Sequence, residues 1–353
     1  MTEAIRFDHR GGVGGVTLNR PRALNALTLE MIIRYDAQLK AWATDDVIKA
    51  VLIEGVGGKA FCAGGDVLAV YHAGQAGDAL AADFFRHEYT LNRRIHAFPK
   101  PYIALLDGIT MGGGVGVSVH GDFRIVTENL MFSMPETGIG LFPDIGGSWF
   151  LPRCPGETGT YLALTGARLG AADAVALGLG THFVPAARLR DFEVALYDAP
   201  WGDGPADATV RNLVEQFAEP AGPAPLQVNF AAIDRCFAYD DMAEILSALE
   251  AEGSDFAADT LKALATKSPT SLKVALAQMR RAEGLTFDER MTVEYRLSQA
   301  FMAGPDFYEG IRALLVDKDK SPAWSPPALA DVTDAMVESH FESLGAKDLR
   351  FLD

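Results

Sequence analysis

Short apolar runs separated by glycine turns dominate the first half of the chain. Such runs between turn residues are typical of strands, and they fall at residues 5–9, 13–18, 50–53, 102–106 and 123–126. Helices are predicted after Thr28, a favourable N-cap, and over residues 79–97, before Pro99. This order of strand, glycine turn, helix and strand indicates α/β architecture, in which ligand sites lie near strand ends.

The pattern changes near residue 199. Proline and glycine are frequent over residues 200–225, which marks loops and a domain boundary. Residues 227–315 show a helical pattern, and a last helix is predicted over residues 330–344. We therefore predict a catalytic core over residues 1–198 and a mostly helical C-terminal region over residues 199–353.

The 353 residues are 49% hydrophobic and 22% charged, which favours a large buried core over disorder. The formal net charge of −16 argues against binding to nucleic acid or to an anionic membrane surface. Three widely spaced cysteines form no CxxC pair, so neither a disulfide framework nor a structural zinc site is expected. With no secretory signal and no apolar run of membrane-spanning length, a cytoplasmic location is expected.

Several common catalytic motifs fail on inspection. The segment around Ser118 lacks the last glycine of a Gly-x-Ser-x-Gly elbow, and we expect this serine to pack inside a small-residue helix. Residues 114–119 lack the last glycine of the Gly-x-Gly-x-x-Gly motif of a dinucleotide-binding loop. No histidines show metal-ligand spacing, so no metal site is predicted.

Two glycine-rich segments, residues 55–65 and 108–116, offer backbone N–H groups to a ligand. A reacting thioester develops negative charge on its carbonyl oxygen, and fixed N–H donors stabilise that charge. Gly113 lies where a helix through His120 is predicted to begin, so its N–H would be free and the helix dipole would assist. Glycine turns are more often only turns, so this feature alone is weak.

Two carboxylates, Glu136 and Asp144, lie in one loop rich in glycine, proline and apolar residues. Ionised carboxylates are disfavoured in such surroundings, which suggests groups tuned for acid–base chemistry. The alternative is structural: Glu136 caps a turn and Asp144 caps the helix after Pro143. The loop by itself leaves both interpretations open.

Together, residues 59–66, 108–116 and 134–147 resemble the crotonase, or enoyl-CoA hydratase/isomerase, superfamily, as do residues 16–27, 164–184 and 305–312. The resemblance implies a spiral of ββα units, a helical C-terminal region and a CoA thioester substrate. It makes the N–H groups of Gly65 and Gly113 the oxyanion donors. It also implies that the adenine end of CoA lies near Arg22, Ala23 and Leu24 and near Ala63, Gly64 and Asp66.

Within the superfamily, one of the two hydratase glutamates is replaced by Gly116, whereas Glu136 matches the other. The sequence around Pro143-Asp144 and over residues 317–324 resembles the 3-hydroxyisobutyryl-CoA hydrolase family. In that family the positions of Glu88, Glu136 and Asp144 contact substrate or are catalytic. The resemblance implies hydrolysis of a short 3-hydroxyacyl-CoA thioester in valine degradation, without metal or other cofactor.

Two alternatives stay open. One is a hydratase or isomerase that acts through Glu136, and the other is a non-catalytic CoA-binding protein. Retention of both Glu136 and Asp144 argues against the second, because a scaffold needs neither acid. The sequence leaves undecided the preferred 3-hydroxyacyl group, whether Glu136 is nucleophile or general base, and whether the chain forms a homo-oligomer.

Overall fold

Six strands form the larger of two sheets in the computed structural model, which describes residues 3–202 and 204–351. Their order is β1 (Ile5–Arg10), β2 (Val13–Leu18), β3 (Ala50–Gly55), β5 (Tyr102–Leu106), β7 (Phe123–Val126) and β9 (His182–Phe183). The first pair is antiparallel and the others are parallel. The five strands predicted from sequence are confirmed. A local apolar pattern is enough to predict strands such as β2 and β5, which are buried on both faces, whereas β1 is mostly exposed.

A second sheet contains three short strands, β4 (Ala60–Cys62), β6 (Ile109–Met111) and β8 (Met131–Ser133). Strand β4 lies inside the segment that the sequence predicted to be only a glycine loop, so that prediction was incomplete. Its three residues are buried and pair in parallel with β6. Whether so short a segment forms a strand depends on the strand it pairs with more than on its own sequence pattern.

The chain forms two compact units. The sheet unit comprises residues 1–65, 90–132 and 168–225, and the helical unit comprises residues 66–89, 133–167 and 226–353. The chain passes several times between the units, so they do not correspond to a single cut along the sequence. The predicted boundary at residues 198/199 stays a prediction.

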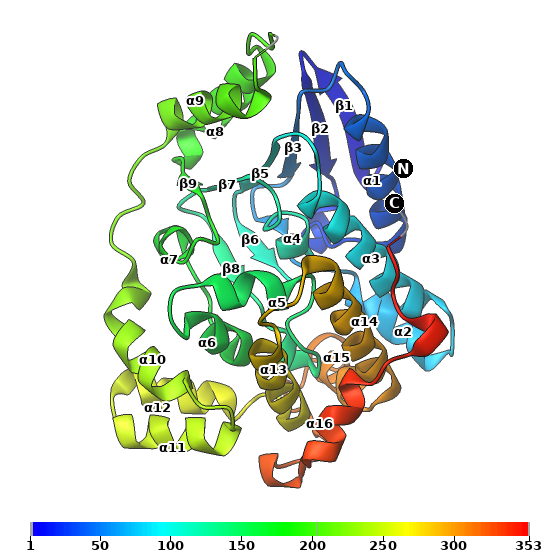
Figure 1. The fold of residues 1–353 in the computed structure, drawn as a ribbon, viewed down its shortest axis with the longest axis vertical. Coiled ribbons are helices and arrows are strands. Elements are labelled where there is room, and N and C mark those ends of the chain that lie inside the picture. The colour runs from blue at the N-terminus through cyan, green and yellow to red at the C-terminus, as the bar shows by residue number, and fades with distance from the viewer. Residues whose placement is uncertain (1–2, 203, 352–353) are drawn as a thin grey trace. The chain divides into compact units, whose positions relative to one another are not determined.

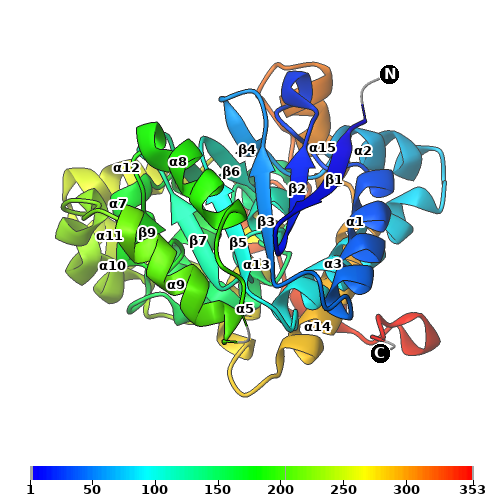
Figure 2. The same cartoon turned by 90° about the horizontal axis from the view of Figure 1, so that it is seen from above.

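In the sheet unit, α1 (Leu29–Ala43) begins after Thr28, whose Oγ1 accepts a hydrogen bond from Met31 N as the sequence predicted. The other helices of this unit are η1 (Pro21–Ala23), α4 (Gly113–Gly116), α7 (Ala171–Ala176), α8 (Ala186–Tyr197) and α9 (Ala206–Phe217). Side chains of α8 and α9, including Phe192 and Val214, pack on Leu52 and Ile125 of the sheet, and Figure 2 shows both helices beside β7 and β9.

Helix α4 is shorter than the sequence predicted. It ends at Gly116 and not near His120. The Ser118 hydroxyl is buried and donates to Gly114 O at 2.8 Å, which confirms that this serine packs internally. Glycine has a low helix propensity, so this glycine-rich run does not continue the helix beyond one turn.

The helical unit holds most of the remaining helices (Figure 1). They are α2 (Val67–Gln75), the first part of α3 (Leu80–His96), η2 (Glu136–Ile139), α5 (Gly147–Phe150), η3 (Leu151–Arg153), α6 (Thr158–Thr165), η4 (Pro225–Asn229), α10 (Phe230–Phe237), α11 (Met242–Glu252), α12 (Asp255–Leu264), α13 (Pro269–Arg281), α14 (Phe287–Ala303), α15 (Asp306–Ile311), η5 (Arg312–Val316), η6 (Leu329–Asp331), α16 (Asp334–Phe341) and η7 (Gly345–Lys347). The helical pattern predicted over residues 227–315 is confirmed. The last predicted helix is shorter, because α16 begins only after its N-cap Thr333.

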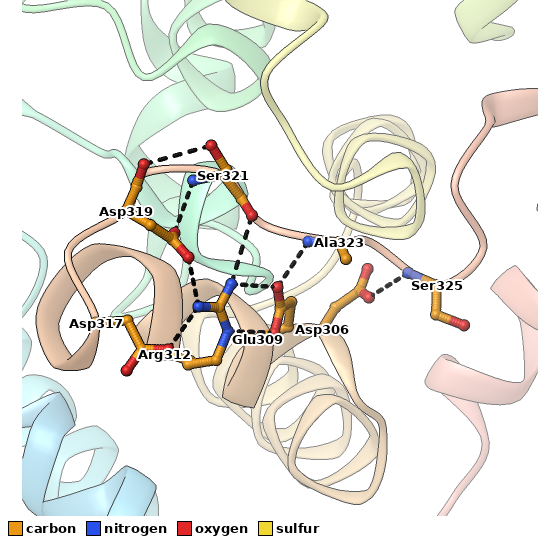
Figure 3. Close-up of polar contacts among 8 residues, drawn as sticks. All are labelled: Asp306, Glu309, Arg312, Asp317, Asp319, Ser321, Ala323 and Ser325. Carbon is orange, nitrogen blue, oxygen red and sulfur yellow. Dashed lines mark hydrogen bonds and ion pairs between the residues drawn. The ribbon is translucent and has the colours of Figure 1, made fainter.

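Polar contacts fasten the segment after α15 to that helix (Figure 3). The Arg312 guanidinium forms two hydrogen bonds of 2.8 Å with the Glu309 carboxylate, and it also bonds Asp317 and Asp319 at 2.7 and 2.6 Å. Farther along, Ser325 N donates to the Asp306 carboxylate at 2.8 Å. Among the described residues, no helix is long and apolar enough to cross a membrane.

Candidate active site

The two glycine loops leave neighbouring strands of the sheet unit. Ala60 pairs with Ile109 and Cys62 with Thr110 in the parallel pair β4–β6, so the chain leaves both strands at the same end. Gly113 is the first residue of α4, as predicted, and the N–H groups of a first helical turn have no intrahelical acceptor. This end of the small sheet therefore presents a backbone donor of the kind that an oxyanion requires.

Close packing explains why glycine occupies these loops. A Cβ added to Gly114 would lie 2.1 Å from Cys62 O, which is too close. One added to Gly64 would make only ordinary contacts, 3.6 Å from Met111 O and 4.0 Å from Gly113 N. Gly64 has a φ of 124°, which side-chain-bearing residues rarely adopt. The loop that contains Gly65 thus lies directly against the start of α4.

The residues predicted to lie near the adenine of CoA also adjoin this loop. Ala63 N donates to Leu24 O at 3.0 Å, and Leu27 N donates to Gly64 O at 2.9 Å. Arg22 and Ala23 are exposed in η1. The structure therefore brings Arg22, Ala23 and Leu24 together with Ala63 and Gly64, whereas Asp66 belongs to the helical unit and caps α2 through Ala69 N.

Asn25 holds these loops in place and was missed from the sequence. Its side chain is fully buried and donates to Val56 O and Ala60 O, both at 2.9 Å. Its φ is 58°, a left-handed conformation that asparagine tolerates better than most residues. Asn25 lies within residues 16–27, which carry part of the family resemblance, and no local pattern indicated a structural role for it.

The three carboxyl groups of the predicted site are buried in the helical unit. Glu88 belongs to α3, Glu136 is the first residue of η2, and Asp144 lies in the loop before α5; they are 3, 4 and 5% exposed. Tyr89 OH donates to Asp144 Oδ2 at 2.8 Å. Among the described residues, neither Glu88 Oε1 nor Glu136 Oε2 has a hydrogen-bond partner.

Burial raises the pKa of all three carboxyl groups. The pKa of Asp144 rises to about 7, although the hydrogen bond from Tyr89 opposes the rise. The pKa values of Glu88 and Glu136 are raised well above their ordinary range, by burial first and then by the charge of Asp144. Lys267 lowers the pKa of Glu136 in turn. Carboxyl groups with raised pKa values can exchange protons near neutral pH, as acid–base catalysis requires.

The structural alternative for Asp144 is wrong. Helix α5 begins at Gly147, and its N-cap is Gly146 with no side-chain capping bond. Asp144 therefore does not cap this helix. A carboxyl group that caps no helix and lies buried beside two others fits a chemical role better than a structural one.

Other residues of this region were not predicted from the sequence. Glu294 on α14 accepts hydrogen bonds from the backbone of Gly146 and Ser148, although Gly146 lies 148 residues earlier. Gln278 on α13 donates to Pro143 O at 2.9 Å. No motif or spacing links such distant positions, and only the packing of α13 and α14 against the loop identifies them.

The comparisons with known proteins agree with this geometry. The family model for enoyl-CoA hydratase/isomerase matches residues 13–341. The chain belongs to the enoyl-CoA hydratase/isomerase family. Among its relatives, the "3-hydroxyisobutyryl-CoA hydrolase, mitochondrial" of Xenopus tropicalis is 49% identical over 342 residues, which cover 96% of this chain and 89% of the relative. The human protein of the same name is 46% identical over 351 residues, which cover 99% and 91%.

Solved structures of the family share the fold. A carnitinyl-CoA dehydratase from Mycobacterium thermoresistibile has a TM-score of 0.92 at 40% identity, covering 99% of both chains. An enoyl-CoA hydratase from Rhodobacter sphaeroides has a TM-score of 0.91 at 40% identity, covering 99% of this chain and 100% of its own. The predicted crotonase-like α/β fold with a helical C-terminal region is confirmed.

One prediction is contradicted by these relatives. A cytoplasmic location was expected, but the 3-hydroxyisobutyryl-CoA hydrolases similar to this chain are mitochondrial. Unpaired cysteines, all three of which are buried here, indicate a reducing environment and do not distinguish one reducing compartment from another. The expectations about nucleic acid and oligomeric state stay predictions.

The expectation that no metal or cofactor is needed also stays a prediction. Within residues 3–202 and 204–351, no group of three or more His, Cys, Asp or Glu side chains is arranged to hold a metal ion.

Proposed function

We propose that the protein hydrolyses 3-hydroxyisobutyryl-CoA to 3-hydroxyisobutyrate and CoA, and therefore acts in valine degradation. The observation that carries this proposal is the buried trio of Glu88, Glu136 and Asp144 in a chain whose relatives at 46–49% identity bear that enzyme's name. Hydrolysis of a thioester needs an oxyanion site, a group that activates water or attacks directly, and a means of holding the acyl group.

In this proposal the N–H groups of Gly65 and Gly113 bind the thioester carbonyl oxygen. Both belong to loops fixed by close backbone packing, so they need no rearrangement as negative charge develops. Loss of one donor of this kind costs about 3–4 kcal/mol of transition-state stabilisation. The CoA portion extends toward Arg22, Ala23 and Leu24, with Ala63, Gly64 and Asp66 on the neighbouring loop.

Glu136 supplies the attacking group. As a carboxylate it either removes a proton from water or adds to the carbonyl carbon to give a mixed anhydride that water then hydrolyses. In the first route water forms the new C–O bond and the C–S bond breaks. In the second route a Glu136 oxygen forms that bond as the C–S bond breaks, and water then cleaves the anhydride to release the acid and the Glu136 carboxylate. In both routes CoA leaves as a thiolate. The chain is fixed next to Glu136, because Thr137 Oγ1 donates to Leu164 O at 3.1 Å and Ser268 N donates to Thr137 O at 3.1 Å.

Asp144 and Glu88 hold the 3-hydroxyl group of the substrate. A carboxylate accepts a hydrogen bond from a hydroxyl, and such bonds to charged groups contribute about 1.5–3 kcal/mol. Tyr89 OH donates to Oδ2 of Asp144, and in this proposal the substrate hydroxyl donates to Oδ1. The reaction needs no metal or nicotinamide, because a thioester is already activated toward attack.

A lyase is the second candidate. Two structures with TM-scores of 0.92 and 0.91 are described as a carnitinyl-CoA dehydratase and an enoyl-CoA hydratase, at 40% identity. In a lyase Glu136 would transfer the proton alone, because the position of the second hydratase glutamate is Gly116.

Thiol release distinguishes the two candidates. Incubated with 3-hydroxyisobutyryl-CoA, the purified protein should release free thiol without added metal, and EDTA should not inhibit. Crotonyl-CoA, followed by the ultraviolet absorbance of its enoyl thioester, is the comparison. Conversion of crotonyl-CoA with no thiol release from any 3-hydroxyacyl-CoA would replace the hydrolase proposal with the lyase.

A further inference from the structure

The turn that carries Asp144 has an unfavourable backbone at Ile145, whose φ is 54°. Gly146 follows with a φ of 84°, which glycine adopts without strain. Isoleucine is β-branched, and a β-branched residue in the left-handed region is a true outlier. Such conformations persist only where the surrounding contacts determine them, and they concentrate at functional sites.

The carboxylate of Glu294 supplies several of these contacts. Its Oε2 accepts from Gly146 N at 2.7 Å, and its Oε1 accepts from Ser148 N at 3.0 Å and from Ser148 Oγ at 2.5 Å. Glu294 has no exposed surface. Gln278 Nε2 also donates to Oε1, at 3.4 Å, so the two oxygens accept from four donors. An ionised carboxylate can satisfy this arrangement, whereas an amide would place its own NH₂ group against at least one of the donors.

Gln278 and Arg290 complete the attachment of the turn. Gln278 Nε2 donates to Pro143 O at 2.9 Å and lies 3.4 Å from Glu294 Oε1. Arg290, one turn before Glu294 on α14, donates to Ser148 O. The backbone is therefore held on both sides of Asp144 by side chains of α13 and α14.

We propose that Glu294 is a positioning residue: it holds the strained turn so that the Asp144 carboxyl stays beside Tyr89 and faces the substrate. Glu294 itself touches no reacting atom, because its oxygens are occupied by the turn. The inference rests on the proposed function only in that it takes Asp144 as a substrate-contacting group.

A double-mutant cycle tests the coupling between the two residues. Glu294→Gln keeps the shape of the side chain but places an NH₂ group against at least one backbone or hydroxyl donor. In the wild-type background we expect kcat/KM for 3-hydroxyisobutyryl-CoA to fall by about 10²-fold, the effect of misplacing a group by roughly 1 Å. In the Asp144→Asn background the same change should cost less than about threefold, because the group being positioned is already lost. An equal fall in both backgrounds would overturn the proposal.

Glu289→Gln is the matched control. Glu289 lies in the first turn of the same helix and also accepts a backbone hydrogen bond, from Thr286 N at 2.8 Å. Unlike Glu294, it is exposed, and it contacts the cap of its own helix instead of the Asp144 turn. This variant should leave kcat/KM unchanged. If Glu294→Gln does not fold, Gln278→Leu replaces it in the cycle. That change removes the donor to Pro143 O together with an Oε1 that has no partner among the described residues.

Amide hydrogen exchange separates this inference from the proposed function. Peptides that span residues 143–150 should exchange faster in Glu294→Gln than in wild type or Glu289→Gln, while the rest of the helical unit is unchanged. A wild-type protein that releases no thiol would remove the proposed function and leave this measurement intact. Unchanged exchange over residues 143–150 would show that Glu294 does not hold the turn, whatever the reaction.

Discussion

Replacing Asp144 with asparagine should stabilise the folded protein at neutral and alkaline pH while impairing the proposed reaction. Asp144 is 5% exposed, and burial raises the pKa of its carboxyl from 3.8 to about 7. In the unfolded chain the carboxyl ionises near its ordinary value. Above pH 7 the folded protein therefore holds a buried charge that the unfolded chain leaves in water, which lowers the free energy of unfolding.

The folded state binds more protons than the unfolded state between about pH 4 and pH 7, so stability falls as the pH rises through this range. At about 1.4 kcal/mol per pKa unit, the loss attributable to Asp144 is roughly 2 kcal/mol at pH 5 and about 4 kcal/mol at pH 8. Asparagine has no proton to lose. The advantage of Asp144→Asn over wild type should therefore be about 2–3 kcal/mol larger at pH 8 than at pH 5.

Neighbouring groups act in the same direction. The charge of Asp144 contributes to the raised pKa values of Glu88 and Glu136, so its removal makes their ionisation less costly as well. Tyr89 keeps an acceptor, because the asparagine Oδ1 can replace the carboxylate oxygen that it now contacts. Asparagine also has nearly the volume of aspartate, so no cavity is expected.

Urea unfolding of both proteins at pH 5 and pH 8 measures this difference. Asp259→Asn, on an exposed pair with Lys262, is a control that should show no comparable pH dependence. An Asp144→Asn advantage that is the same at both pH values, or smaller at pH 8, would refute the reasoning. It would mean that Asp144 ionises in the folded protein as easily as in the unfolded chain.

Three further changes test other parts of the site. Glu136→Gln should lower kcat by at least about 10²-fold, which is the lower range for loss of a general base. The Kd of a CoA thioester, measured by calorimetry, should change little. Near-wild-type turnover would show that Glu136 has only a structural role. Asp144→Gly should lower thiol release from 3-hydroxyisobutyryl-CoA about 10–100-fold, the value of one hydrogen bond to a charged group. Isobutyryl-CoA should lose less, and equal fractional losses would assign Asp144 to the thioester chemistry itself. Gly114→Ala should destabilise the sheet unit by roughly 1–3 kcal/mol, because its Cβ would lie 2.1 Å from Cys62 O; an unchanged melting temperature would contradict that close contact.

The sequence by itself determined those parts of the protein that depend on neighbouring residues. The strands from β1 to β7 in the large sheet follow from short apolar runs, and α1 follows from the cap at Thr28. The start of α4 at Gly113 was also predicted, because a run of glycines there precedes a stretch of small residues with a helical pattern. The end of that helix was misplaced, because weak helix formers let the surroundings decide where it stops.

The carboxyl site was determined only in part. The loop composition and the family resemblance pointed to Glu88, Glu136 and Asp144, but they left a helix-cap role for Asp144 open. The position of Gly146 as the N-cap of α5 removed that role. The direction of each pKa likewise required the structure, because burial and the neighbouring charges come from three separate elements.

Only the tertiary structure identified Glu294 and Gln278. Their hydrogen bonds to the Asp144 turn span more than a hundred residues of chain, and neither position carries a motif. Local periodicity reports which face of an element is buried, but not which element it meets. Whether a buried carboxylate has partners, and which strained turn it holds, is decided when distant helices pack together, because hydrogen bonds and desolvation depend on distance in space rather than on separation along the chain.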